Sequence, residues 1–433
     1  KSSDVVEAPV VKLLQSIFED AVHVGASDIH IEPDEHVLRI RNRIDGMLQE
    51  QVMKEKRIGT ALVSRLKLMS GLNISEKRLP QDGRFNIRIK EKSIDVRVST
   101  MPLQYGESVV MRLLDQSSGN LNLEKVGMPP KLLERFRHYI HKPHGMVLVT
   151  GPTGSGKTTT LYGALNELNL PTKKIITVED PVEYRLSRIN QVQVHTQIGL
   201  TFASVLRTAL RQDPDVVLIG EMRDQETAEI GLRASITGHL VLSTLHTNDS
   251  ISTAVRLIDM GIPGFMVATS LEAIIAQRLI RRICSDCIAD YQPSVHERLW
   301  LRGMVGKEGE SLHFKHGQGC HKCNNTGYKG RMGVFELLEI DLAMGDALRL
   351  DDTNAFARAA RNNKNFVSLT RNAIHYASLG QTTIEEAIRV SGEEIDPSLL
   401  EDDGQEVVVE VEPEEHPAAV DEVLTLDPGV LTP

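Results

Sequence analysis

The stretch GPTGSGKTTT, residues 151–160, matches the pattern of a phosphate-binding loop at every defined position. Its glycines free backbone N–H groups to surround a polyphosphate, and Lys157 supplies a positive charge for the outer phosphates. Thr158 adds a hydroxyl for Mg²⁺. An apolar run at 146–149 precedes the loop and a helical pattern at 161–168 follows it. We therefore predict a nucleoside triphosphate site formed by Gly151, Pro152, Thr153, Gly154, Ser155, Gly156, Lys157, Thr158 and Thr159.

Length and composition favour a multidomain protein without a membrane span. A chain of 433 residues is long enough for two or three domains with ample cores. No apolar run approaches the ~18 residues that cross a bilayer, and no secretory signal is present. The four cysteines form two Cys-x-x-Cys pairs, which suits a reducing cytosol better than a disulfide scaffold. Because the chain starts at Lys1 rather than Met, we expect it to be a fragment that lacks an N-terminal segment.

The net charge of −10 is concentrated at one end of the chain. Residues 391–433 contain 14 Asp and Glu and no Lys or Arg, so the rest has 49 basic and 45 acidic residues. The body is thus mildly basic, whereas nucleic-acid binding usually requires a concentrated basic face. We expect no nucleic-acid partner.

Periodicity and composition divide the chain into four parts. A helical pattern is followed by alternating segments at 84–89 and 93–99, which indicates a small α+β domain. Further along, short apolar runs alternate with helical patterns, as in a parallel sheet wrapped by helices. The expected parts are an α+β domain at 1–115, a linker at 116–125, an α/β domain at 126–395 and an acidic, disordered tail at 396–433.

Polar residues follow the apolar strands that we expect at 175–178 and 216–219. Ligands of open α/β sheets bind at the carboxyl ends of the strands, so these residues should converge on the phosphates. Hydrolysis needs one carboxylate to orient the attacking water and another on the Mg²⁺ side. Glu183 and Glu221 are the candidates, although a single Glu after a strand is commonly a solvated cap.

Two histidines and two arginines offer further phosphate contacts. His239 and His246 flank the expected strand at 240–245, and the sharper hypothesis for His246 is a catalytic role in helping a γ-phosphate sensor. Arg207 and Arg211 are four residues apart and should share one helix face that leads into the site. Structural histidines and surface arginines are the ordinary alternatives for all four.

A second strong pattern is the pair of Cys-x-x-Cys segments, separated by 32 residues. Each pair can bind one side of a tetrahedral metal ion, and glycines 317, 319, 327 and 330 allow tight turns in the second segment. We predict a structural Zn²⁺ held by an insert at 284–330, with free thiols or a redox pair as alternatives. The expected zinc ligands are Cys284, Cys287, Cys320 and Cys323.

Together these motifs resemble the secretion ATPases that assemble type IV pili and drive type II secretion. The resemblance extends over roughly residues 8–390 and includes the paired cysteines. The matching segments of the larger domain are GPTGSGKTTT at 151–160, TVEDPVEYR at 177–185, LRTALRQDPDVVLIGEMRD at 206–224 and TGHLVLSTLHTND at 237–249. Those of the smaller domain are ASDIHIEP at 26–33, RIDG at 43–46, LPQDGR at 79–84 and DVRVSTMPLQYGESVVMRLL at 95–114.

The resemblance implies an α/β fold: a RecA-like P-loop NTPase domain with a zinc-binding insert, preceded by a smaller α+β, PAS-like domain. It implies a homo-hexamer that uses ATP, Mg²⁺ and Zn²⁺ and lies in the cytoplasm against the inner membrane. Hydrolysis there rotates the two domains and turns a membrane platform protein that adds pilin subunits. In that family Arg97 and Arg112 would reach the nucleotide, Glu183 would orient water and Glu221 would serve the Mg²⁺ side.

The presence of a zinc insert resembles the secretion and pilus-extension branch of the family. The sequences GALNELN at 163–169 and RINQVQV at 188–194 resemble those of ATPases of mannose-sensitive haemagglutinin-type pili. In that branch cyclic di-GMP binds a further N-terminal domain, which we expect to lie outside this chain. A ring-shaped nucleic-acid translocase is the main alternative and predicts stimulation by DNA. A small-molecule kinase, a GTPase and a non-enzymatic zinc scaffold explain fewer of the motifs.

Overall fold

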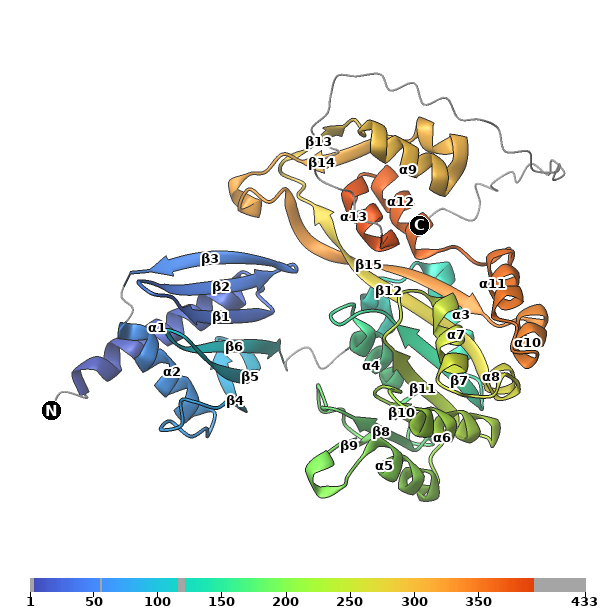
Figure 1. Ribbon diagram of the computed structural model, residues 1–433, viewed down its shortest axis with the longest axis horizontal. Helices are drawn as coiled ribbons and strands as arrows, with labels where there is room; N and C mark the ends of the chain where they lie inside the picture. Colours follow the sequence, from blue (N-terminus) through green and yellow to red (C-terminus); the bar gives the residue numbers. More distant parts are fainter. Residues whose placement is uncertain (1–3, 55–56, 116–120, 393–433) are drawn as a thin grey trace. The chain divides into compact units, whose positions relative to one another are not determined.

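The computed structural model describes residues 4–54, 57–115 and 121–392, which form two compact units divided between residues 120 and 121 (Figure 1). The expected linker residues 116–120 and the expected tail at 396–433 lie outside the described residues. Residues 121–125, which we also assigned to the linker, belong to the second unit, because Leu123 is fully buried in its core.

The first unit is a six-stranded antiparallel sheet in the order β3-β2-β1-β6-β5-β4. Alternate strand residues pack against two helices. On β5 the buried residues include Ile94, Val96 and Val98, which confirms the predicted alternation. The elements are α1 (Asp4–His23), β1 (Asp28–Pro33), β2 (Leu38–Ile44), β3 (Met47–Met53), α2 (Arg57–Met69), β4 (Gln81–Ile89), β5 (Lys92–Leu103) and β6 (Gly106–Asp115).

The second unit has a seven-stranded sheet in the order β15-β12-β7-β11-β10-β8-β9. Six strands are parallel, and the edge strand β15 is antiparallel to β12. The strands are β7 (Gly145–Thr150), β8 (Ile175–Glu179), β9 (Asn190–Gln193), β10 (Val216–Ile219), β11 (Leu240–Leu245), β12 (Leu271–Ile283) and β15 (Tyr328–Glu339).

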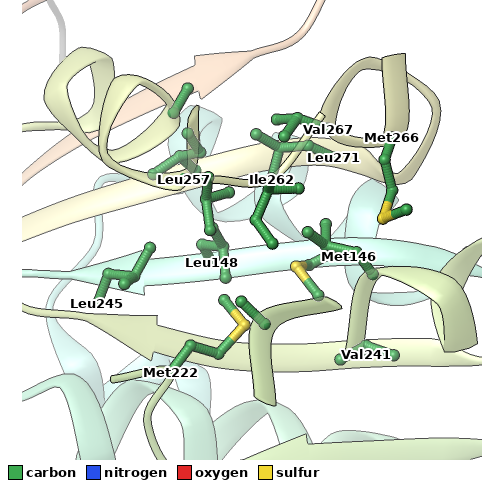
Figure 2. Packing of buried hydrophobic residues seen from close by; sticks show 14 of the residues in the cluster. Met146, Leu148, Met222, Val241, Leu245, Leu257, Ile262, Met266, Val267 and Leu271 are labelled. Atoms are coloured by element: carbon green, nitrogen blue, oxygen red, sulfur yellow. The ribbon is translucent and has the colours of Figure 1, made fainter. Parts of the chain in front are cut away.

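Helices cover both faces of this sheet, because successive residues of its buried strands point to opposite sides. Met146 and Leu148 face one core, shown in Figure 2, and Val147 and Val149 face the other. The core around Val147 and Val149 includes α3 (Pro130–Ile140), α4 (Lys157–Leu168) and the 3₁₀ turn η2 (Leu123–Val126). The core around Met146 and Leu148 includes α5 (Phe202–Ala209), α6 (Gln225–Ile236), α7 (Ser250–Asp259), α8 (Gly264–Ser270), α10 (Leu342–Arg349) and α11 (Thr353–Arg361).

A smaller core forms where β12 and β15 extend beyond the rest of the sheet (Figure 1). Leu301 and Phe314 of the insert are buried there, together with the last two helices. The elements of this region are β13 (Ile288–Tyr291), α9 (Val295–Val305), β14 (Phe314–Gly317), α12 (Leu369–Ser378) and α13 (Ile384–Ser391). None of the described helices combines the length and hydropathy of a membrane span.

Candidate active site

The phosphate-binding loop lies between the fully buried strand β7 and helix α4, in the arrangement that its sequence predicts. Gly156 precedes α4 with a φ of 90°, a conformation that favours glycine. Gly151 has no room for a side chain, since a Cβ there would lie 2.5 Å from the Gln277 carbonyl oxygen. Lys157 and Thr158 begin α4, whose N-terminus attracts anions.

Lys157 is 9 % exposed and folds back onto its own loop. Its Nζ donates to the carbonyl oxygens of Gly151 at 2.7 Å and Pro152 at 3.0 Å. Burial and repulsion by Arg278 lower the pKa of Lys157 to about 8, while Glu221 opposes the shift. Among the described residues, the hydrogen-bond partners of Lys157 are neutral carbonyl groups, and a second cation is nearby. A cation in this setting is well placed to bind an anion.

Glu221 follows β10 and is 8 % exposed. Its Oε1 lies 2.5 Å from the guanidinium of Arg223, and its Oε2 lies 3.4 Å from Nε2 of His246, which follows β11. Within the described residues, Oε2 is buried without a hydrogen bond. Lys157, Glu221 and His246 therefore meet at the carboxyl ends of β7, β10 and β11.

These residues fit a magnesium nucleotide. An unsatisfied buried carboxylate oxygen costs free energy unless a cation or water contacts it. Glu221 supplies that oxygen, Thr158 offers its hydroxyl, and the loop offers N–H groups and Lys157 to phosphates. When bound, Mg²⁺ would neutralise charge on the phosphates.

Glu183 lies in the loop that follows β8, at the same edge of the sheet. Its N–H donates to the Tyr162 hydroxyl at 3.3 Å, and that hydroxyl donates to Glu179. Burial raises the pKa of the Glu179 carboxyl, opposed by hydrogen bonds from Thr177, Tyr162 and Gln191. Tyr162 belongs to α4, so the helix behind the phosphate loop also supports the loop of Glu183.

Three residues that we considered for the site make their described contacts with residues outside the phosphate loop. Arg207 is exposed on α5 and pairs with Glu226 of α6. Arg211 does not continue that helix, because α5 ends at Ala209 and a 3₁₀ turn follows. His239 precedes β11, so it lies at the amino ends of the strands, opposite to the phosphate loop. Its Nδ1 is 3.0 Å from the Ala234 carbonyl oxygen.

Arg97 and Arg112 belong to the first unit and face each other across β5 and β6. Arg112 is exposed, and its Nε donates to Asp28 at 3.0 Å. The row continues to Arg84 on β4, so three arginines cross one polar face of the sheet. A contact of these arginines with a nucleotide stays a prediction.

The four cysteines form one cluster with all sulfur atoms within 4.8 Å of one another. The pairs Cys284–Cys320 and Cys287–Cys323 are each 3.9 Å apart, and Cys320–Cys323 are 3.7 Å apart. Four thiolates at about 2.3 Å from a zinc ion would be about 3.8 Å from one another. The cluster therefore fits a closed tetrahedral Zn²⁺ site, and Zn²⁺ there would hold two chain segments together.

Several residues around the site were not identified from the sequence. Arg223 follows Glu221 by two positions, and this closeness in sequence could have indicated that the two side chains pair. In the sequence Tyr162 looks like an ordinary core residue and Glu179 like one more polar residue at the end of a strand. Their contact depends on how α4 packs on β8. Gln277 and Arg278 are more than a hundred residues from the loop, and only the pairing of β12 with β7 brings them to it.

Comparisons with known proteins give a consistent result. The model of a family described as "Type II/IV secretion system protein" matches residues 4–389. The chain is 48% identical to "Type II secretion system protein E" of Aeromonas hydrophila, covering 90% of this chain and 77% of the relative. It is 47% identical to "Type IV pilus assembly ATPase PilB" of Myxococcus xanthus, covering 88% and 68%.

One of the other relatives is "Type II secretion system ATPase E" of Vibrio cholerae, 46% identical over 89% of this chain and 76% of its own length. A crystal structure of the pilus retraction motor PilT with bound ADP superposes with a TM-score of 0.57 at 27% identity, covering 89% of this chain and 98% of the other. The Legionella pneumophila ATPase DotB, at 20% identity and a TM-score of 0.64, shares the fold over 88% of this chain and 96% of its own.

Proposed function

The chain belongs to the type II/IV secretion system protein family, and we propose that it is a hexameric motor in which ATP hydrolysis rotates two domains. It is an ATP hydrolase of that family with a RecA-like α/β fold. The observation that carries the proposal is the convergence of Lys157, Glu221 and His246 at one edge of the sheet.

Each residue would have a distinct part in hydrolysis. The loop and Lys157 bind the phosphates, Glu221 with Thr158 serves the Mg²⁺ side, and Glu183 orients the attacking water. His246 contacts Glu221, so a change at the γ-phosphate can be transmitted to the start of the next helix, α7. Arg97 and Arg112 complete the site from the first unit and neutralise charge in the transition state.

The proposed domains are a small α+β domain at 1–115 and an ATPase domain at 126–395, to which residues 121–125 also belong. The ATPase domain includes the zinc insert at 284–330. The relatives named above include both secretion and pilus ATPases at nearly equal identity, so identity does not separate the two roles. We infer that the motor serves type IV pilus assembly, of the mannose-sensitive haemagglutinin type, or type II secretion.

The partner that this role requires is the cytoplasmic domain of an inner-membrane platform protein, so the motor would work at the cytoplasmic face of that membrane. Cyclic di-GMP would act through a further N-terminal domain, and we place no site for it in residues 1–433. None of the comparisons reported above supports the nucleic-acid translocase alternative.

A genetic replacement tests the role. A source strain that carries Lys157→Ala in the full-length protein should lose either its surface pili or its secreted enzymes, because the loop would lack its phosphate-binding cation. Electron microscopy of pili and assays of secreted enzymes distinguish the two outcomes. A strain that keeps both, with normal amounts of the variant protein, would contradict the proposal.

A further inference from the structure

We propose that Gln277 is a positioning residue that holds the phosphate-binding loop in its nucleotide-binding conformation. Gln277 lies on β12 and is 2 % exposed. Its side-chain amide donates to the Ser155 carbonyl oxygen at 2.7 Å and accepts from the Thr160 hydroxyl at 2.7 Å. One side chain from the neighbouring strand thus connects the loop to the first turn of α4. The inference rests on the proposed nucleotide site.

The bond to Ser155 fixes the orientation of one peptide group of the loop. In a trans peptide the carbonyl and the following N–H point in opposite directions. Holding the Ser155 carbonyl towards β12 therefore directs the N–H of Gly156 away from β12. Gly156 has a φ of 90°, and glycine reorients easily, so this peptide needs an external anchor to keep its N–H available for phosphate.

The primary amide of Gln277 matches both partners at this position. The Ser155 carbonyl needs a donor and the Thr160 hydroxyl needs an acceptor, and Gln supplies both in one group. Thr160 is fully buried, so loss of the amide would leave its hydroxyl without this partner. The close approach of Gln277 also explains the glycine at 151, where a Cβ would lie 2.5 Å from the Gln277 carbonyl oxygen.

The next residue links the same strand to a second loop of the site. Arg278 donates to the Asn248 carbonyl oxygen at 2.6 Å, two residues beyond His246. Strand β12 therefore contacts both the phosphate loop and the loop that carries His246. A change at Gln277 would therefore alter the position of the phosphate loop rather than the bond-breaking step.

Nucleotide affinity tests the inference. We expect Gln277→Met to raise the Kd for ADP about tenfold, because two hydrogen bonds of the loop are lost. Thr160→Val removes one of them and should raise it about fivefold. The double variant should bind no more weakly than Gln277→Met, since both changes remove the same bond. For ATP turnover, KM should rise while kcat stays within about twofold, because saturating phosphates reorder the loop.

Thr382→Val is the matched control, since Thr382 is also fully buried and donates one 2.7 Å bond, at the far end of β12. Its ADP affinity should be unchanged. If Gln277→Met fails to fold, the Kd of Thr160→Val for ADP tests the inference instead. Unchanged Kd values in folded variants, or an equal loss in Thr382→Val, overturn the inference. ADP binding by Lys157→Ala tests the nucleotide site separately from the role of Gln277. Normal ADP binding by that variant would overturn the nucleotide site itself.

Discussion

Glu221 and Lys157 place opposite charges in one largely buried corner, and neither is fully paired by the residues around it. Lys157 contacts two carbonyl oxygens of its own loop. Glu221 contacts Arg223 with one oxygen and leaves the other without a hydrogen bond in the described part of the chain. Both residues therefore have bonding capacity that a magnesium nucleotide would use.

Glu221→Gln should leave ATP bound and lower hydrolysis about a hundredfold, the order expected for one oriented catalytic group. The amide keeps the shape of the side chain and removes the negative charge that we propose for the Mg²⁺ side of the site. Phosphate release and ATP binding are measured on the same preparation. Glu226→Gln, which alters an exposed carboxylate on α6, is the control. Near-normal turnover by Glu221→Gln would remove this residue from the mechanism.

Nucleotide affinity should depend on the protonation of Lys157. Its pKa is lowered to about 8 in the free chain, chiefly by burial. Bound phosphates favour the charged form, so binding takes up a proton above pH 8. We expect the affinity for ADP to fall up to tenfold per pH unit above about pH 8, with no effect of this lysine below it.

Calorimetry between pH 7 and about 9.5 in two buffers measures both affinity and proton uptake. Lys157→Arg provides the comparison, because a guanidinium stays charged throughout this range. The variant should show weaker but pH-independent binding. An equal decline in wild type and Lys157→Arg would assign the pH dependence to another group.

At the scale of elements, the sequence predicted local features well and long-range pairing poorly. Strands β4 and β5 show alternating patterns, and the loop motif identified β7 and α4 directly. The pairing of β12 with both β7 and β15 joins segments far apart in the sequence, so no local pattern revealed it. The same limit applies to site residues: Glu221 follows its own strand, whereas Gln277 reaches the loop through tertiary pairing.

The insert shows a similar limit. Its paired cysteines predicted a structural metal and no local pattern predicted a core, yet Leu301 and Phe314 pack in a core with α12 and α13. The cysteine cluster lies where β12 ends and β15 begins. Zn²⁺ would therefore stabilise the two cysteine loops, while helix α9 is held by apolar contacts.

We expect one zinc ion per chain, and Cys320→Ser should lose it together with some solubility or assembly. Nucleotide binding should persist, because the cluster and the phosphate loop lie in different parts of the unit. Metal analysis of reduced protein and an ADP titration measure the two effects. His321→Ala, which changes an exposed neighbour of Cys320, should retain zinc. A freshly purified reduced sample without zinc would contradict the site.

At the scale of the whole molecule, the row of Arg84, Arg97 and Arg112 tests the proposed ring. Arg112→Ala should keep ATP binding and lose most turnover, because a transition-state arginine can contribute ~10³-fold or more. If the arginine acts across a subunit interface, mixing Arg112→Ala with Lys157→Ala chains should restore part of the activity. Arg88→Ala, another exposed arginine of the same unit, is the control. Loss of turnover without recovery would favour action within one chain, and wild-type turnover by Arg112→Ala would show a structural residue.

The most direct test of the motor is the response of ATP hydrolysis to its partner. Phosphate release by the wild-type chain is measured alone, with the purified cytoplasmic domain of the platform protein, and with duplex DNA. A motor at a membrane platform predicts stimulation by the platform domain, no effect of DNA, and no turnover by Lys157→Ala in any condition. Stimulation by DNA without any response to the platform domain would contradict the account and support the translocase instead.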